Sequence, residues 1–305
     1  MKHFLLLFLL TFSLSAKTLT PNDVFGLGVL IQDHIHTLLK HYKIVHHHDA
    51  ILKRDKILNT NIMPRHKWQK AYEILVKINM FRIKHNLVRI EPVGIEARLS
   101  VKHAMVYEMN MRILTELKII EMRNNMPRKT YKLKTFTNKT PLDNYNLLVH
   151  ISAALDELNE QALTPSYVFS ETMRIYDDIT IILNHLGLND ETMPSNVIEN
   201  AIPEDAFKTS FEVLSRIARL QRGVGIDAVD FSEFQNKEVT PSDVYTLTGL
   251  IIAELQTIKA FIGLTKSITT PATSSVGKKP ENVEQLMRWN LKRLNEIDKL
   301  YKGAY

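Results

Sequence analysis

Charged side chains recur at one position of a repeated pattern, and this is the arrangement in the chain best suited to bind a small charged ligand. Each copy has a proline, an aromatic or bulky residue four positions later, and a long run of periodic apolar residues; one copy has His103 in place of the proline. The position nine residues after the aromatic slot is polar in most copies. In chain order it holds His34, Lys77, Glu116, Ala154, Asp178, Arg216, Glu254 and Arg293.

In the second half of the chain the charges at this position alternate in sign. These charged residues lie about three positions from the apolar residues that form one face of each helix. Each charged side chain therefore flanks the core of the bundle near the middle of its helix. If four such helices surround one core, the side chains sit at one level and can pair as structural ion pairs. The other interpretation is a polar pocket inside the bundle for a small charged ligand. Its candidate residues are Lys77, Glu116, Asp178, Arg216, Glu254 and Arg293.

Histidines are concentrated in the first half, where ten of the twelve lie between His34 and His150. Imidazoles together with a carboxylate are ligands for zinc, copper or nickel. The candidate metal ligands are His34, His41, His46, His48 and Asp49. They do not follow a strict spacing such as HExxH, so a divalent metal site, a pH-responsive face and solvated histidines all remain open. No other cofactor is expected.

Positive charge is also concentrated in the first half. Residues 17–160 contain 23 Lys and Arg against 14 Asp and Glu, a net charge of +9, whereas residues 161–305 contain 15 against 19, a net charge of −4. The surplus includes the link MPRKTYKLKTFTNK, with Arg128, Lys129, Lys132 and Lys134. We expect this link to bind an envelope protein or an anionic envelope surface, and no nucleic acid. A solvated basic link, or attraction between the two halves, is the structural alternative.

Several kinds of chemistry have no support in the sequence. The chain contains no cysteine, which excludes disulfides, thiolate catalysis and cysteine-ligated metal sites. Nucleophile elbows, phosphate-binding loops and dinucleotide fingerprints are absent from the sequence. The carboxylates of Asp177 and Asp178 are adjacent on a helix and point to different faces, which does not suit joint acid–base catalysis. The sequence therefore predicts a protein that is not an enzyme.

The first sixteen residues, MKHFLLLFLLTFSLSA, have the layout of a secretory signal peptide. A short basic start precedes an apolar run and then small residues, with cleavage expected after Ser15 or Ala16. The alternative is a retained N-terminal anchor helix. No later run reaches about 18 apolar residues, so we expect a periplasmic or secreted protein and not an integral membrane protein.

The repeated phrase itself predicts the start of a helix. In TPSDVYTLTGLIIAEL, Thr240 suits the N-cap, Pro241 the first helical position and Asp243 the third position. The apolar residues that follow are spaced three or four apart, as in a helix packed on one face. Related phrases begin at Thr20, Thr140 and Thr164.

The spacing of these starts predicts an all-α fold. The steps are 43, 39 and 38 residues, then 24, then 38, 38 and 39. This pattern indicates an internal duplication, with a signal peptide at 1–16, a basic, His-rich four-helix unit at 17–160 and an acidic four-helix unit at 161–305. The expected helices are 21–43, 64–85, 100–123, 141–160, 165–186, 203–221, 241–262 and 280–302. A continuous α-helical repeat array is the alternative.

The connections between the helices are long, at about 18 residues. An extended link of this length spans about 60 Å and can return along a helix, so successive helices could be parallel, with the links packed along the bundle. The order and direction of the helices within each unit stay open. The general form resembles exported helical-bundle sensing and adaptor modules. We therefore expect an exported, non-enzymatic binding or adaptor protein acting on an envelope partner. The alternative is a periplasmic sensor module that binds a small charged ligand or a metal ion within the bundle.

Overall fold

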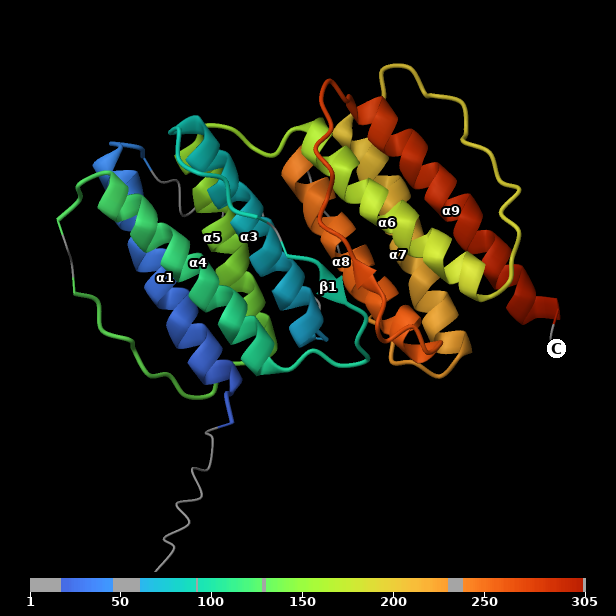
Figure 1. Ribbon diagram of the computed structural model, residues 1–305, viewed down its shortest axis with the longest axis horizontal. Coiled ribbons are helices and arrows are strands. Elements are labelled where there is room, and N and C mark those ends of the chain that lie inside the picture. Colours follow the sequence, from blue (N-terminus) through green and yellow to red (C-terminus); the bar gives the residue numbers. More distant parts are fainter. Residues whose placement is uncertain (1–17, 46–60, 92, 128–129, 230–237, 304–305) are drawn as a thin grey trace, which may run out of the picture.

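The computed structural model describes residues 18–45, 61–91, 93–127, 130–229 and 238–303. The described chain is all-α, as predicted, with one short two-stranded pairing (Figure 1). Its helices are α1 (Pro21–His41), α3 (Pro64–Lys84), α4 (His103–Arg123), α5 (Pro141–Asn159), α6 (Pro165–His185), α7 (Pro203–Gly223), α8 (Pro241–Phe261) and α9 (Pro280–Gly303). The strands are β1 (Ile95–Glu96) and β2 (Ile268–Thr269). No helix among the described residues combines the length and the apolar character needed to cross a bilayer.

The helix starts have the predicted chemistry. Seven of the eight helices begin at a proline, because its fixed φ suits the first helical position and its missing N–H is not needed there. In α8 the Thr240 hydroxyl accepts a hydrogen bond from Asp243 N, and the Asp243 carboxylate accepts one from Thr240 N at 2.7 Å. Thr140 and Asp143 form the same reciprocal cap at α5. The repeated phrase is therefore a helix-start signal.

The helix ends also share one backbone conformation, a feature that we did not predict. A residue with positive φ follows the last helical residue within two positions in α1 and α3–α8: Lys43, Asn86, Asn125, Glu160, Gly187, Gly225 and Gly263. The next amide then bonds back to a carbonyl five residues earlier, as Ile226 N does to Gln221 O at 2.9 Å. This is a Schellman-type end, which satisfies a carbonyl that the helix leaves unpaired.

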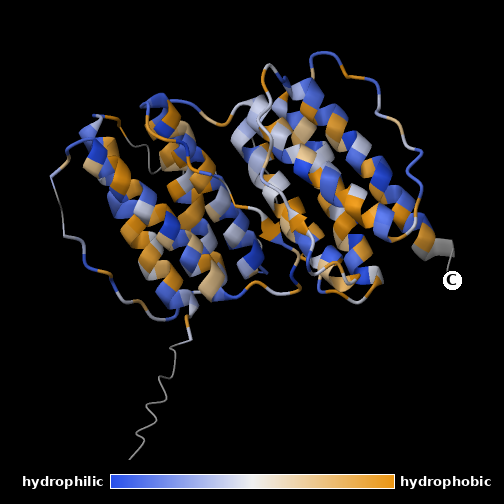
Figure 2. Cartoon of the chain, in the orientation of Figure 1, coloured by the Kyte–Doolittle hydropathy of each residue, from blue (hydrophilic) through white to orange (hydrophobic). Residues whose placement is uncertain are grey.

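The helices form two four-helix units with the same packing order. In the first unit α1 and α3 each pack against α4 and α5; in the second, α6 and α7 each pack against α8 and α9. Each unit encloses apolar side chains, including Ile31 and Leu117 in the first and Ile179 and Leu255 in the second, all at 0% exposure. Hydrophobic and hydrophilic residues are interspersed along every helix (Figure 2), as needed to bury one face of each. The shared packing order fits a duplicated quartet, whose common origin stays a prediction.

Within each unit all four helices run in the same direction, an arrangement that the length of the links allows. The prolines that begin α6, α7, α8 and α9 line one apolar pit at one end of the second unit: Pro165, Pro203, Pro241 and Pro280. In the first unit, Asn144 Nδ2 near the start of α5 donates to Pro21 O at the start of α1, at 3.0 Å. At the opposite end, Tyr42 after α1 donates to Asn124 after α4 at 2.7 Å.

The two units meet through α3 and α8, which run antiparallel. Arg65, near the start of α3, contacts Glu254 late in α8, whereas Glu73 in the middle of α3 contacts Thr246 near the start of α8. The links after α3 and α8 also pair, with Ile95 opposite Thr269 in an antiparallel register. Gly94 permits this approach, since a Cβ there would lie 2.6 Å from Ile268 Cγ2. Helices of the first unit therefore run opposite to those of the second.

Candidate functional site

Glu254 of α8 is the centre of a buried charge cluster between the two units. Its Oε1 and Oε2 accept hydrogen bonds from Arg65 Nε and Nη2 at 2.8 and 3.0 Å. His66 Nε2 also contacts Oε1, and Gln221 of α7 donates to Oε2 at 2.6 Å. Glu254 and His66 are 1% and 0% exposed. Glu254 thus joins α3 of the first unit to α7 and α8 of the second.

The surroundings fix the charge states in this cluster. Burial alone would raise the pKa of Glu254, but His66 and Arg65 lower it to about 2. Burial lowers the pKa of His66, and its Nδ1 accepts a hydrogen bond from Met63 N at 3.0 Å. His66 is therefore a neutral ring whose Nε2 carries the proton and donates it to Glu254. The cluster is one carboxylate held by one guanidinium and a neutral imidazole.

A second buried network is centred on Glu73 of α3, about two turns from His66. Lys70 Nζ donates to both Glu73 oxygens at 2.8 and 3.0 Å, and Ser152 Oγ of α5 donates to Oε1 at 2.5 Å. On the other side, Thr246 Oγ1 of α8 donates to Oε2 at 2.9 Å. Burial opposes ionisation, but Lys70 and Lys77 lower the pKa of Glu73 to about 2. The carboxylate of Glu73 thus connects α5, α3 and α8.

A third network lies inside the second unit. Asp178 of α6 accepts hydrogen bonds from Lys259 Nζ at 2.6 Å and from Thr269 Oγ1 of β2 at 2.6 Å. Gln256 of α8 donates to the same carboxylate at 3.0 Å. All four side chains are buried. This network attaches the link that carries β2 to α6 and α8, as required of a connection that packs along the bundle.

The mid-helix charged residues do not meet one another. Their nearest ion-pair partners are Asp156 for Lys77, Arg82 for Glu116, Lys259 for Asp178, Asp298 for Arg216, Arg65 for Glu254 and Asp190 for Arg293. Each partner lies outside the predicted set, so the structure does not bring the six residues together. A ligand-binding role for them stays a prediction.

The order of the helices around the second bundle differs from their order along the chain. Signs alternate along the chain, but α6 packs against α8 and α7 packs against α9. The two acids, Asp178 and Glu254, are therefore on neighbouring helices, and the two bases, Arg216 and Arg293, are on the other neighbouring pair. Each acid-bearing helix also packs against a base-bearing helix, since α6 contacts α9 and α7 contacts α8, yet the four side chains pair with charges outside this set.

The predicted metal ligands are only partly within the described residues. His34 Nδ1 pairs with Glu121 Oε1 at 2.7 Å, and the His41 ring stacks edge-on against Tyr42 with ring centroids 5.1 Å apart. His46, His48 and Asp49 lie outside the described residues. Among the residues that the structure describes, no group of three or more His, Asp and Glu side chains is placed to hold a metal ion. The metal site stays a prediction.

The basic link is placed on the outer side of the first unit. Lys132 and Lys134 are exposed, and Lys134 Nζ lies 3.8 Å from Asp33 of α1; Arg128 and Lys129 lie outside the described residues. The link backbone is held against α1, where a Cβ on Gly26 would lie 2.5 Å from Lys134 O. The Phe25 and Phe136 rings meet edge to face at 4.9 Å, and the Thr37 and Tyr131 hydroxyls are 2.5 Å apart.

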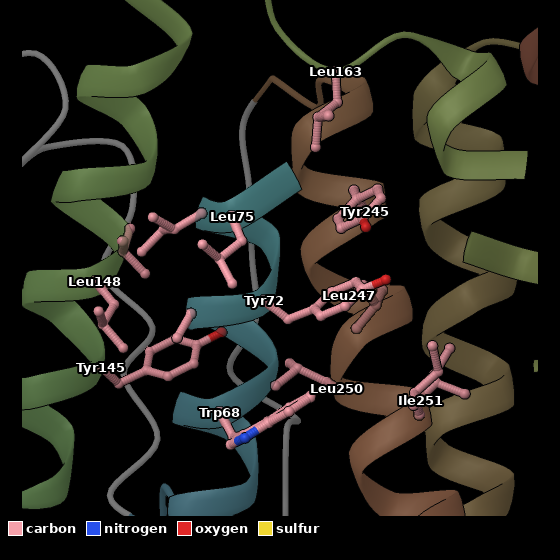
Figure 3. Close-up of a cluster of buried hydrophobic side chains, with 14 of the residues drawn as sticks. Trp68, Tyr72, Leu75, Tyr145, Leu148, Leu163, Tyr245, Leu247, Leu250 and Ile251 are labelled. Atoms are coloured by element: carbon pink, nitrogen blue, oxygen red, sulfur yellow. The ribbon is translucent and has the colours of Figure 1, made fainter. Parts of the chain in front are cut away.

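Sequence reasoning missed the charged residues of α3 that bind the second unit. Of the 21 residues of this helix, 16 are buried, because it lies between α5 on one side and α8 on the other (Figure 3). The missed residues are Arg65, His66, Lys70 and Glu73 of α3 and Lys259 of α8. A signal was present in PRHKWQKAYEILVK, where charged residues and aromatic residues share every face of the helix. A helix without one continuous apolar face can pack against neighbouring helices on opposite sides.

Together these networks give most of the buried charges named here a structural partner, whereas Lys132 and Lys134 of the basic link are exposed. No protein-family model matches the chain, and neither a curated protein nor a solved structure matches it. Inference about function therefore starts from the exposed residues of this chain.

Proposed function

We propose that the protein is an exported, non-enzymatic binding or adaptor protein whose first unit binds an anionic envelope partner. The observation that supports this proposal most is the segment from Lys118 to Lys139, defined here as the basic segment. It contains seven Lys and Arg residues and one acidic residue, Glu121. Glu121 is already paired with His34. The segment therefore carries a surplus of positive charge that favours an anionic partner, and Lys134 contributes to it while lying 3.8 Å from Asp33.

The basic segment also offers apolar contacts. On the outer face of α4, Met122 is 58% exposed beside Lys118 and Arg123, and Leu133 on the link is 51% exposed. Apolar anchors surrounded by cations are a common composition for a surface that binds a protein or a membrane interface. The contacts of the link with α1 hold its backbone in place before binding, which reduces the entropy lost when a partner binds.

Charge reversal of the link tests the proposal. The purified protein is sedimented with an envelope fraction, and the Lys132→Glu/Lys134→Glu variant is compared with a Lys208→Glu/Lys299→Glu control. Lys208 and Lys299 are 66% and 70% exposed on the second unit, so the control makes the same change of charge elsewhere. We expect the link variant to bind about tenfold more weakly and the control to bind as the wild type does, with binding weakened by salt.

Two results would argue against the proposal. Equal binding by the link variant and the wild type would show that the basic segment is not the docking surface. Equal losses in the link variant and the control would show that only the net charge of the chain matters. Protease treatment of the envelope fraction before sedimentation identifies the source of the anionic groups, since a protein partner is then lost and a lipid or polysaccharide surface is retained.

A further inference from the structure

The two ends of the molecule carry surfaces of opposite charge. The basic segment, which is the end of α4 and the link after it, lies on the left of Figure 1, and the link between α6 and α7 runs along α9 on the right, at the other end of the long axis. Residues 190–205 of that link and the start of α7 contain five acidic residues and no Lys or Arg. We call residues 190–202 the acidic link. Because α3 and α8 hold the units in a fixed arrangement, these surfaces cannot meet within one chain.

The acidic link is held in place and exposes apolar side chains. Its backbone is bound by α9, through Gln285 Nε2 to Ser195 O at 2.7 Å and Arg288 Nη2 to Asn196 O at 2.5 Å. Figure 2 shows hydrophobic residues along the link, and four large apolar side chains of the link are exposed: Met193 at 75%, Val197 at 45%, Ile198 at 47% and Ile202 at 53%. A cluster of this kind within ten residues exceeds the scattered exposure of an ordinary surface.

Part of the negative charge around the link is already compensated. Asp190 pairs with Arg293 at 2.5 Å, and Glu204 pairs with Lys208 at 2.9 Å. Glu191 and Glu199 are both exposed and form no ion pair with a described residue. Two cations of α9 contact the link through its backbone: Lys292 Nζ lies 3.5 Å from Met193 O, and Arg288, which contacts Asn196 O, is paired with Glu284. The outer side of the acidic link therefore presents two uncompensated carboxylates beside four apolar side chains.

We propose that the acidic link docks onto the basic segment of a second copy of this chain. Each surface combines exposed apolar side chains with charges, and the signs are opposite: Met193 and Ile198 beside Glu191 and Glu199 on one, Met122 and Leu133 beside lysines on the other. Opposite charges around apolar contacts give an interface its orientation and its specificity. Because the surfaces differ and lie at opposite ends, the contact is heterologous, and it produces head-to-tail chains or closed rings.

Paired charge reversals test this contact in the purified protein by sedimentation velocity across a range of concentrations. The head variant is Lys132→Glu/Lys134→Glu, and the tail variant is Glu191→Lys/Glu199→Lys. We expect the wild type to show a mass that rises with concentration and falls with salt. Each variant alone is expected to remain a monomer, because the reversed side chains on one surface carry the same sign as the charges that they would face on the other. An equimolar mixture regains association, since the basic segment of the tail variant fits the acidic link of the head variant.

Association of the mixture, but not of either variant alone, distinguishes a specific contact from non-specific association. A wild type that stays monomeric, a variant that associates alone as the wild type does, or a mixture that fails to associate would each overturn the inference. The tail variant also distinguishes self-association from binding to the envelope fraction. The tail variant keeps the basic segment, so it should sediment with the envelope fraction as the wild type does while losing self-association.

Discussion

Arg65 and Glu254 form a two-point ion pair across the boundary between the units, with N–O distances of 2.8 and 3.0 Å. The residues are 189 positions apart in the chain. The planar guanidinium matches the carboxylate, and the geometry fixes the angle of the side chains as well as their separation. This pair, with the Glu73 network, makes the two bundles one body and keeps the basic segment and the acidic link apart.

Removing either partner of this ion pair should destabilise the protein strongly. We expect Arg65→Ala and Glu254→Ala each to lower the free energy of unfolding by about 3–5 kcal/mol, because each leaves an uncompensated buried partner. The double variant should cost less than the sum of the two. Urea unfolding measures all three. Glu204→Ala, which removes an exposed pair with Lys208, is the control and should leave the unfolding midpoint nearly unchanged. Additive losses at Arg65 and Glu254 would contradict a direct interaction.

Stability should fall in acid in two stages. Burial lowers the pKa of His66 below 6.5, so below that pH the unfolded chain binds a proton more readily and stability declines. The pKa values of Glu73 and Glu254 are lowered to about 2 from 4.5, so their contribution is complete above pH 4.5 and is lost as pH falls towards 2. Each contributes on the order of 3 kcal/mol. Chemical unfolding from pH 7 to pH 3 measures this loss, and a flat profile would disprove it.

Two buried lysines of α3 should respond in opposite ways to replacement by methionine. Burial lowers the pKa of Lys67 to about 8, and its ammonium contacts a neutral partner, His103 Nδ1, at 3.3 Å. The difference from 10.5 corresponds to roughly 3 kcal/mol of destabilisation below pH 8. Lys67→Met should therefore stabilise the protein at pH 7, with a gain that disappears as pH approaches 10.5.

Lys77 is the matched control on the same helix. Burial favours the neutral amine, but Asp156 and Glu73 raise the pKa of Lys77 above its ordinary value. Lys77→Met leaves Asp156 without its cation and removes one of the two cations around Glu73, and should destabilise the protein by about 3–5 kcal/mol. Thermal and urea unfolding at pH 7 and pH 10 compare the two variants. Equal effects of both substitutions would contradict the assigned environments.

The repeated helix ends make a prediction about backbone conformation. Gly225 has φ +76°, and no heavy atom lies within 4 Å of the position that a Cβ would take there, so Gly225→Ala tests the left-handed conformation alone. We expect a loss of about 1–2 kcal/mol. Gly223, two residues earlier, also has open space around its Cβ position but no positive φ. Gly223→Ala should be neutral or stabilising. Calorimetry distinguishes them, and equal shifts would exclude a conformational cause.

Local chemistry explains why the helices could be predicted from the sequence. Threonine, proline and aspartate at fixed offsets specify a helix start, and Pro165, Pro203 and Pro241 begin helices where expected. The length of the links allowed parallel helices but did not decide their direction. These features depend on residues close together in the chain.

The contacts between distant residues could not be predicted in the same way. Lys70 and Glu73 are three residues apart and match an exposed helical ion pair, yet both are buried between α5 and α8. The partners of the mid-helix charged residues also depend on which helices are neighbours in the bundle. Asp178 and Glu254 lie on adjacent helices, a fact that the alternation of signs along the sequence does not contain.

Parallel helices within each unit are the arrangement on which the placement of both charged surfaces depends, and cysteine cross-linking tests it most directly in this cysteine-free chain. Asn22 Oδ1 at the start of α1 lies 2.8 Å from Lys139 N, just before α5. We predict that Asn22→Cys/Lys139→Cys is joined by a short thiol cross-linker, whereas Asn22→Cys/Glu160→Cys, with its second thiol about 28 Å further along α5, is not. Efficient cross-linking of the second pair and none of the first would contradict the parallel arrangement.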